Sequence, residues 1–344
     1  MQGKFRFAGL LVLAAILGLT GAAWAAPGDT ADDPVIITSA AELAAIEKIS
    51  ADDPDRLGTL RKNLAKHYKL GADIDLNNET WTPIGKGSTP FMGTFDGSGK
   101  LISGLLITDA RDDTGLFGHV GAGGVVKNLG VSGSVTGGYN VGGVAGSNSG
   151  TVSNCYFTGS VTGKNYHSGG VVGYNGGTVS NCYNIGDISG KDYVGGVAGY
   201  NTKGTVEYCY NIGSVSGKVL IGGVLGWNGA GGKMQHCLSL GLKVTAEGGS
   251  AGRVAGDSDE DNATLLSNKA RADMKVYKNT TELLIPVSAP DGIHGEDVPL
   301  GAPLAEVFAG WSDDIWNIPG GSLTAGASLP TLKAVPQVPE PKLP

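Results

Sequence analysis

Four cysteines recur at nearly constant spacing, and thiols can form disulfides, bind metals or act as nucleophiles. They stand at Cys155, Cys182, Cys209 and Cys237. A straight row of equivalent thiols cannot surround a tetrahedral ion, no CxxC pair is present, and no base recurs beside them. We therefore expect neither a metal site nor thiolate catalysis.

Carboxylates are what a polysaccharide-cleaving enzyme would need, as an acid/base pair or as calcium ligands. Between residues 115 and 249 no two acids occupy equivalent positions of adjacent repeats: Asp187, Asp192, Glu207 and Glu247. Three others are more suggestive, but "ADIDL" and "TFDGSG" are typical of strand ends and turns: Asp73, Asp75 and Asp96. No HExxH motif is present either. We expect no catalytic residue, no metal and no cofactor.

Two periodic sets of aromatic residues are the best candidates for ligand binding. One set follows the cysteines and comprises Tyr156, Tyr183 and Tyr210, and the other comprises Tyr174, Tyr200 and Trp227. We expect both sets to face outward, where rows of amphipathic rings suit stacking on sugars or anchoring a protein partner. The alternative is that each ring lies along the chain, covers glycine-rich backbone and stacks only on its own neighbours.

Asparagines follow the second aromatic set at the same period. They stand at Asn148, Asn175, Asn201 and Asn228, and a further set directly precedes the column of Leu129 and the cysteines, at Asn128, Asn154 and Asn181. Such residues fit corners at which the side-chain amide bonds neighbouring backbone or the asparagine of the next repeat. The alternative is that these asparagines bind a ligand.

The elements that carry these residues repeat at a fixed period, which is typical of a solenoid or a propeller. In "VGGVAGSN", "SGGVVGYN", "VGGVAGYN" and "IGGVLGWN" the first paired glycine falls at Gly142, Gly169, Gly195 and Gly222, with a weaker match at Gly252. A propeller blade needs four strands in roughly 40–45 residues, whereas this shorter period holds about three short ones. The sequence predicts an all-β fold: a right-handed parallel β-helix of about six three-strand coils.

Apolar columns provide the core of that helix. One comprises Leu116, Val144, Val171, Val197, Val224 and Val254, and another comprises Val126, Val152, Val179 and Val206. A column adjacent to the first is also apolar: Phe117, Ala145, Val172, Ala198, Leu225 and Ala255. Side chains alternate along a strand, so adjacent columns in one strand cannot both face inward. The pattern does not decide which of the two does.

The cysteines share their column with Leu129, which indicates that they face the core. Aligned neighbours in a parallel sheet keep Cβ atoms about 4.8 Å apart, beyond the roughly 3.5–4.5 Å of a disulfide. This geometry favours a stack of buried thiols. An even number of cysteines in an exported chain keeps disulfides open as the alternative.

The repeats, for example "GGVVGYNGGTVSNCYNIGDISG", resemble the GLUG motif of bacterial surface and secreted proteins, including adhesins and some immunoglobulin A peptidases. Flanking segments such as "YKLGADIDLNNETWTPIG" and "WSDDIWNI" resemble the beginning and end of such domains, so the resemblance spans roughly residues 35–333. It implies the β-helical architecture. It supplies no catalytic residues that could be carried over.

The ends of the chain predict export and capping. Lys4 and Arg6 precede an apolar run, and Ala23-Trp24-Ala25 suits cleavage after Ala25, so residues 1–25 read as a signal peptide. Residues 26–110 should hold a capping helix with a Ser39/Glu42 capping box, then the first coils. Residues 111–270 hold the repeats, 271–333 a C-terminal cap in which Trp311 and Trp316 plug the last coil, and 334–344 an extended Pro-rich tail.

Taken together, these features predict a non-catalytic protein, secreted or held at the cell surface, that recognises glycans or cell-surface proteins. A carbohydrate-active enzyme on the same scaffold and a spacer without a ligand are the alternatives. Loss of two basic residues with the signal peptide takes the formal charge from −7 to −9, and the other basic residues are scattered in the sequence. We therefore expect neither nucleic-acid partners nor, after cleavage, an integral membrane span.

Overall fold

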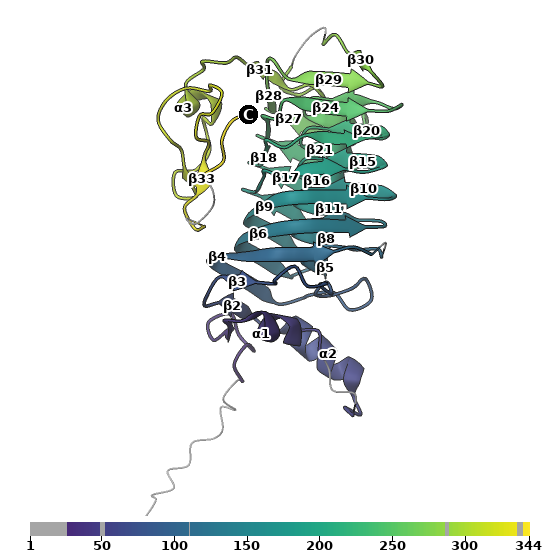
Figure 1. The fold of residues 1–344 in the computed structure, drawn as a ribbon, viewed down its shortest axis with the longest axis vertical. Coiled ribbons are helices and arrows are strands. Elements are labelled where there is room, and N and C mark those ends of the chain that lie inside the picture. The colour runs from purple at the N-terminus through teal and green to yellow at the C-terminus, as the bar shows by residue number, and fades with distance from the viewer. Residues whose placement is uncertain (1–25, 49–51, 110, 286–288, 336–339) are drawn as a thin grey trace, which may run out of the picture.

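The chain folds into an elongated stack of coils joined by parallel strand pairing (Figure 1). The computed structural model describes residues 26–48, 52–109, 111–285, 289–335 and 340–344. The predicted signal peptide and the middle of the Pro-rich tail lie outside these residues. The predicted β-helix is confirmed, with about 8 turns rather than six. The difference arises because strands before residue 111 already stack in register with the repeats.

The largest sheet holds 20 strands and wraps around more than one side of the stack. In chain order they are β1 (Val35–Ile37), β2 (Tyr68–Leu70), β3 (Ile74–Asp75), β4 (Thr94–Ile107), β6 (Val125–Gly137), β9 (Thr151–Gly163), β12 (Thr178–Ser180), β13 (Tyr183–Asn184), β14 (Asp187–Ser189), β17 (Thr205–Glu207), β18 (Tyr210–Asn211), β19 (Val215–Gly217), β22 (Lys233–Gln235), β23 (Leu238–Ser239), β24 (Lys243–Ala246), β27 (Thr264–Leu266), β28 (Lys269–Arg271), β29 (Lys275–Lys278), β30 (Thr281–Glu282) and β31 (Glu296–Val298).

Two narrower sheets complete the coils. One comprises β7 (Val141–Gly142), β10 (Tyr166–Gly169), β15 (Asp192–Gly195), β20 (Val219–Gly222) and β25 (Ala251–Gly252). The other comprises β5 (Phe117–Val120), β8 (Ala145–Asn148), β11 (Val172–Asn175), β16 (Ala198–Asn201), β21 (Leu225–Asn228) and β26 (Ala255–Ser258). A later repeat, such as the one from β12 to β16, thus holds five short strands, whereas the sequence predicts three. Additional corners divide what is one long strand, such as β9, in the earlier coils.

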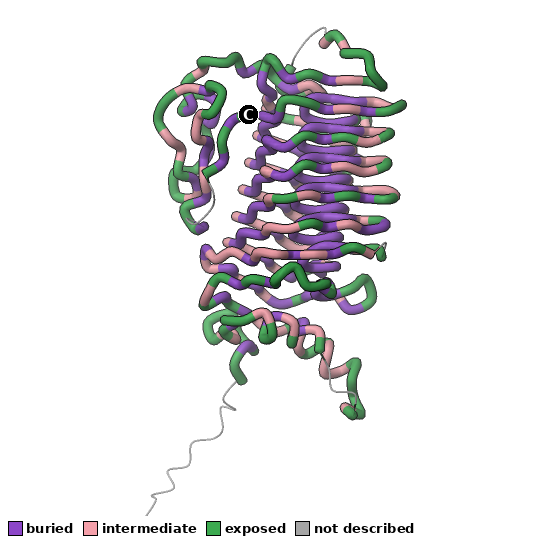
Figure 2. Tube along the Cα trace, viewed as in Figure 1, coloured by how far each residue is buried: buried purple, intermediate pink, exposed green. Residues whose placement is uncertain are grey.

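The register follows the sequence period. Gly142, Gly169, Gly195, Gly222 and Gly252 pair in succession. Val126, Val152, Val179 and Val206 do the same and are fully buried. Figure 2 shows the result as a continuous buried interior that runs along the stack.

Both adjacent apolar columns face the core. Val197 and Ala198 are each fully buried, as are their equivalents in the other repeats. The chain bends between β15 and β16 at Gly196 and Val197, so the two neighbours lie on different sides of a corner. A corner removes the alternation that a single straight strand would impose. Glycine is needed at this bend, because a Cβ on Gly196 would lie 2.2 Å from Cγ of Asn211.

Two further corners use left-handed backbone at residues other than glycine. One column has φ between 51° and 55° at Asn128, Asn154, Asn181, Tyr208, His236 and Ser267, and the other between 53° and 67° at Asn140, His167, Tyr193 and Leu220. Asparagine tolerates this conformation well, whereas Tyr and Leu adopt it at a cost. Stacking on the coils above and below therefore has to hold these corners in place.

Buried asparagines form ladders parallel to the axis. Amide Nδ2 groups donate to the Oδ1 of the next coil at 2.8 Å from Asn148 to Asn175, from Asn175 to Asn201 and from Asn201 to Asn228. A second ladder, which the sequence analysis did not include, joins Asn184 to Asn211 at 2.7 Å. Each amide also bonds nearby backbone, so the ladders satisfy corner carbonyls that the strands leave unpaired.

The cysteine side chains form a buried column of free thiols. Each Sγ bonds a backbone carbonyl two positions earlier, for example Cys155 to Ser153 at 3.1 Å. Leu129 pairs with Cys155, so the first coil continues the column with an apolar side chain. Burial raises the pKa of the Cys155 and Cys209 thiols.

Two helices lie across the first coil. The predicted helix is α1 (Ala40–Ala45), whose Glu42 N–H donates to Ser39 Oγ at 3.3 Å, and Leu43 and Ile46 are buried under it. Ile49, expected on the same face, lies outside the described residues. The sequence analysis missed α2 (Arg56–Ala65), which is amphipathic only weakly and buries Leu64.

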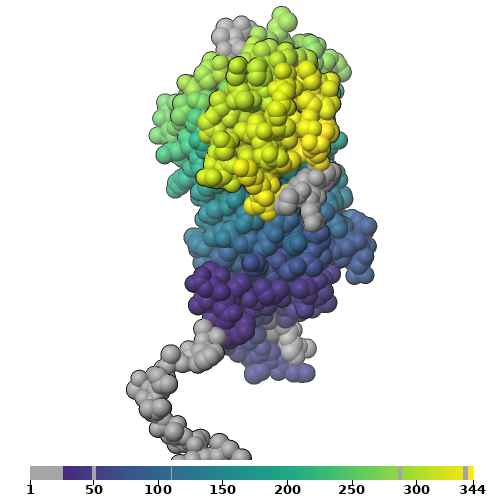
Figure 3. Space-filling view, turned by 90° about the vertical axis from the view of Figure 1, so that its left-hand side faces the viewer, coloured from purple at the N-terminus to yellow at the C-terminus, as the bar shows by residue number. Residues whose placement is uncertain are grey.

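The C-terminal segment does not plug the last coil, so that prediction is wrong. Instead α3 (Leu304–Val307) and the hairpin of β32 (Trp316–Asn317) with β33 (Thr331–Leu332) run back along the side of the stack (Figure 3). The end of the chain is not an extended tail either: Leu343 is buried, and the Pro344 carbonyl accepts a hydrogen bond from Arg271. Leu283, Ile285 and Ile293, which precede this segment, are partly buried and pack against the core of the stack.

Breaking one step of the asparagine ladder should destabilise the stack. Asn201→Ala removes the acceptor of Asn175 and the donor to the Gly204 carbonyl, which leaves buried polar groups without partners. We expect a loss of about 2 kcal/mol or more in the free energy of unfolding, measured by urea denaturation. The exposed Asn262→Ala variant is the control. Equal effects of the two substitutions would contradict the role of the ladder.

The thiol column should be inaccessible in the folded protein. We expect the native chain not to react with an aromatic disulfide reagent, because all four thiols are buried. In guanidinium without reductant, four thiols should titrate. A count of two or none in the purified exported protein would show that neighbouring cysteines are oxidised.

Candidate functional site

The first aromatic set does not face solvent. Tyr156, Tyr183 and Tyr210 are fully buried, so the expected outward orientation is wrong for them and they cannot form an exposed binding surface. They still stack on one another along the axis, with ring centroids 5.2 Å and 4.9 Å apart. Burial raises the pKa of the Tyr183 and Tyr210 hydroxyls.

The C-terminal segment is what covers these tyrosines. Trp311 and Trp316 pack against Tyr210, with centroids 6.2 Å and 5.9 Å away. The Tyr210 hydroxyl donates to the Pro330 carbonyl at 2.6 Å, and Trp316 Nε1 donates to Asn181 Oδ1 at 3.3 Å. Figure 3 shows this segment lying over the side of the coils.

The second aromatic set is partly exposed and belongs to a larger cluster, which we call the aromatic face. Ring contacts join its seven members: Tyr139, Tyr166, His167, Tyr174, Tyr193, Tyr200 and Trp227. Tyr139 is 40% exposed, and the other six are half-buried. The face therefore offers rings that are firmly packed on one side and open on the other.

Strand pairing positions the centre of the aromatic face. Tyr174, Tyr200 and Trp227 pair in register on β11, β16 and β21. Their centroids are 5.4 Å and 5.1 Å apart, close to the strand spacing. His167 and Tyr193 reach the same rings from left-handed corners: His167 stacks on Tyr200 at 4.9 Å.

Four members of the face were not predicted from the sequence. Tyr139, Tyr166 and Tyr193 recur at the period of the repeat, so the period alone could have revealed them. They were not recognised because the repeat was aligned on its glycines and cysteines. Tyr166 and Tyr193 also do not pair with each other in the strand register. Tyr166 pairs with Asp192, whereas Tyr193 lies at the corner position equivalent to His167.

His167 is held neutral within the face. Asn140 Nδ2 donates to Asp113 Oδ1 at 2.8 Å, so its Oδ1 is the atom that accepts the proton of His167 Nδ1 at 2.7 Å. Burial lowers the pKa of His167 to about 4. At neutral pH the imidazole is thus another uncharged ring of the aromatic face.

A small polar pocket adjoins the face at Tyr174. It has a volume of about 230 Å³ and is lined by Gly87, Asp113, His119, Asn140, Ser147, Ser149 and Tyr174. Ser147 donates to Asp113 Oδ1 at 2.5 Å, and His119 Nε2 lies 3.2 Å from Ser149 Oγ. Because His119 does not connect a serine to the aspartate, these groups form no nucleophilic triad. They are suited to hydrogen bonding of hydroxyl groups.

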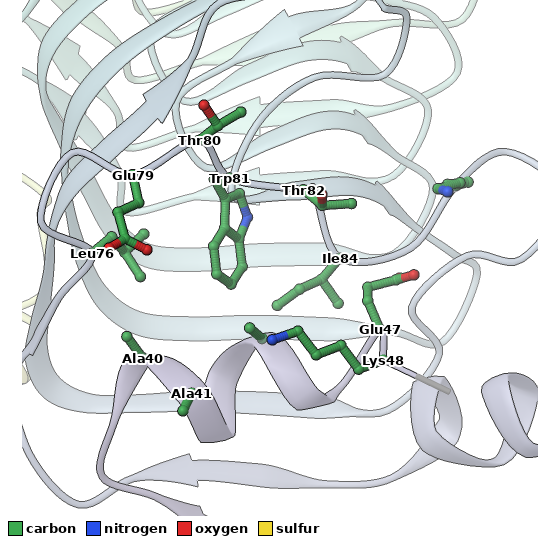
Figure 4. Close-up of a pocket in the computed structure, with 12 residues that line it drawn as sticks. Ala40, Ala41, Glu47, Lys48, Leu76, Glu79, Thr80, Trp81, Thr82 and Ile84 are labelled. Carbon is green, nitrogen blue, oxygen red and sulfur yellow. The ribbon is translucent and has the colours of Figure 1, made fainter. Parts of the chain in front are cut away.

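A second cavity lies between α1 and the first coil (Figure 4). It measures about 630 Å³, and Trp81 projects into it from above Ala40 and Ala41. The indole is only 7% exposed and donates to the Leu116 carbonyl at 3.0 Å, which gives it a structural role. The rim mixes Glu47 and Glu79 with two lysines, Lys48 and Lys86, so its charges favour no single ligand class.

The suggestive carboxylates accept hydrogen bonds from backbone N–H groups. Asp73 Oδ1 accepts the N–H of Leu101, Asp75 Oδ1 that of Asn77, and Asp96 Oδ1 that of Ser98, all at 2.8–2.9 Å. Within the described part of the chain, no group of three or more His, Cys, Asp or Glu side chains could hold a metal ion.

The model of the GLUG motif matches residues 137–162, 164–189 and 192–216. The chain carries three GLUG motifs. Each motif corresponds to about one coil, and together the GLUG repeats contain every member of the aromatic face except Trp227.

Among the described residues no helix is long and apolar enough to cross a bilayer.

Two curated relatives each match part of this chain. Halomucin of Haloquadratum walsbyi is 39% identical over 151 residues, which is 40% of this chain and 2% of halomucin. A protein of Evansella cellulosilytica named "Putative Gly-rich membrane protein" is 30% identical over 140 residues, 36% of this chain and 14% of that protein. The matched region is thus a small part of both relatives.

A solved structure resembles almost the whole chain. The crystal structure of a protein from Bacteroides ovatus, named a "putative immunoglobulin A1 protease", superposes with a TM-score of 0.65. It covers 89% of this chain and 94% of its own, at 20% sequence identity. At that identity the likeness shows a shared fold and carries no function to the GLUG repeats.

His167 should make the stability of the chain depend on acid pH. The unfolded residue takes up a proton near pH 6.5, and the folded one only near pH 4. The stability that depends on His167 being neutral is therefore complete above pH 6.5 and is lost as the pH falls towards 4. In His167→Asn, the free energy of unfolding measured by urea titration should fall less over this range. Asparagine suits the left-handed corner, as Asn140 shows in the preceding coil. Parallel pH profiles of the two proteins would contradict this assignment.

Proposed function

We propose that this chain is an exported, non-catalytic recognition protein that binds glycan chains on its aromatic face. The observation that carries the proposal is the aromatic face itself: seven rings in mutual contact, half-buried on a rigid stack, at intervals close to one coil. Such rings offer large apolar area with little loss of side-chain entropy on binding.

The chemistry around the face favours a glycan over a protein partner. A sugar presents an apolar ring face and a rim of hydroxyls, and Tyr174 lies next to a pocket whose Asp113, Asn140 and Ser147 can bond hydroxyls. A protein partner would need a broad patch with an apolar core. Of the exposed large apolar residues in the described chain, only Tyr139 belongs to the face.

An extracellular location is part of the same proposal. It is supported by the predicted signal peptide and by similarity to a protein named halomucin and to one named as a membrane protein. The lack of catalysis is supported by the suggestive carboxylates, Asp73, Asp75 and Asp96, which are engaged in hydrogen bonds to backbone N–H groups.

Removing a ring from the centre of the face should weaken binding. We expect Trp227→Ala and Tyr200→Ala each to weaken binding to responding polysaccharides by about tenfold or more, because each loses a stacking platform. Affinity electrophoresis against a panel of soluble polysaccharides measures this effect. Tyr277→Ala is the matched control, since this half-buried tyrosine lies on β29 outside the aromatic face.

Other outcomes would select the other functions. Release of reducing ends or unsaturated products from the same panel would identify a carbohydrate-active enzyme. If no polysaccharide retards the wild-type protein, and if Trp227→Ala changes only thermal stability, the chain is a spacer.

A further inference from the structure

A row of lysines accompanies the aromatic face. Lys164, Lys191 and Lys218 recur at the period of the repeat, each just before the strand that opens the corner, and all three are exposed. The Lys218 N–H donates to the Lys191 carbonyl at 2.6 Å, so these two lie on directly adjacent coils. Lys191 Nζ is 5.8 Å from the ring centroid of Tyr166, which places the row beside the face.

The row is unfavourable for the folded chain on its own. Like charges on neighbouring strands repel, and adjacent coils are separated by only about 4.8 Å. In the described part of the chain, none of these three lysines has a carboxylate within ion-pair distance. Half-buried Asp192 and exposed Glu247 lie on the same corner, and exposed Asp112 accepts the N–H of Tyr139 at the other end of the face. Positive charge is therefore in excess only over the three coils that carry the row. This occurs in a chain of net charge −7.

We propose that the ligand of the aromatic face is an acidic polysaccharide, whose carboxylate or sulfate groups lie along Lys164, Lys191 and Lys218 while its sugar rings stack on the neighbouring tyrosines. This inference rests on the proposed glycan function and narrows its substrate class. An extended polysaccharide running along the axis brings one sugar to each coil, because the rise per coil is close to the length of a sugar residue. Each lysine then faces an anion at the same interval.

Single-stranded nucleic acid, which also combines anions with stacking bases, is less well matched. It carries a phosphate at every nucleotide and depends on extensive neutralisation by cations. Here three cations stand beside Asp192 and Glu247 in a chain of net negative charge. Weak acids spaced along a chain of hydroxyl-rich sugars fit both the modest charge and the polar pocket at Asp113.

The test compares charge-matched variants of the full chain. One replaces the row (Lys164→Gln, Lys191→Gln and Lys218→Gln), and its control replaces three exposed lysines elsewhere (Lys62→Gln, Lys69→Gln and Lys233→Gln). Probes are polygalacturonate, chondroitin sulfate, neutral dextran and galactan, and an oligothymidine. Binding is measured at low and high salt, and circular dichroism and melting temperature verify folding.

We expect the acidic polysaccharides to bind in preference to the neutral ones, more weakly at high salt. The row variant should lose about tenfold in affinity, the control variant should not, and replacement by arginine should restore binding. Binding of neutral polysaccharides with no effect of the row variant overturns this inference but leaves the proposed function intact. Tighter binding of the oligothymidine overturns it in favour of nucleic acid. Binding to none of the polysaccharides overturns both proposals.

Discussion

The structure depends on one constraint: a single coil cannot bury its own apolar side chains. Val179 and Val197 are fully buried because their own coil and the coils on either side enclose them. Burying each valine contributes roughly 1.5–3 kcal/mol, but only once its neighbours are in place. Stability is therefore a property of the stack, and every other feature of the repeat must preserve the register between coils.

The corners show how that constraint restricts the sequence. A chain that turns several times per coil leaves carbonyls without strand partners, and buried amides such as Asn201 and Asn211 satisfy them while linking successive coils. The same ladders explain why position 196 is a glycine: a Cβ on Gly196 has no room because Asn211 packs against it. Beyond Asn211 the column continues with Ser239 and Ala270, which have no side-chain amide. At the last position equivalent to Gly196 an arginine, Arg253, replaces the glycine and forms an ion pair with Asp297.

The period of the repeat predicted which residues stack on one another along the axis of the coils. It did not predict how the residues of one coil are arranged around that axis. Columns such as Val152 and Val179 could be predicted because equivalent residues of successive coils must pair. That Val197 and Ala198 both face inward could not, because a corner leaves no periodic signal of its own. The burial of Tyr183 depends on Trp316, which lies far along the chain and outside the repeats. For the candidate site, the period gave Tyr174, Tyr200 and Trp227, but their contacts with His167 and Tyr193 arise from a left-handed corner.

This chain has one aromatic column that its own C-terminal segment covers and one that is open to solvent, and the contacts of the first indicate what the second could bind. Tyr156, Tyr183 and Tyr210 stack at coil spacing, and a long segment of the chain itself lies along them, held by Trp316 against the rings and by the Pro330 carbonyl on the Tyr210 hydroxyl. The stack thus already binds one ring-bearing segment of its own chain through a row of tyrosines and a few polar contacts. The aromatic face repeats this arrangement on another side of the coils and keeps its rings half-exposed. Since the internal example pairs aromatic stacking with hydrogen bonds spaced along the axis, an elongated external ligand that meets the same two requirements is the physical counterpart of the C-terminal segment.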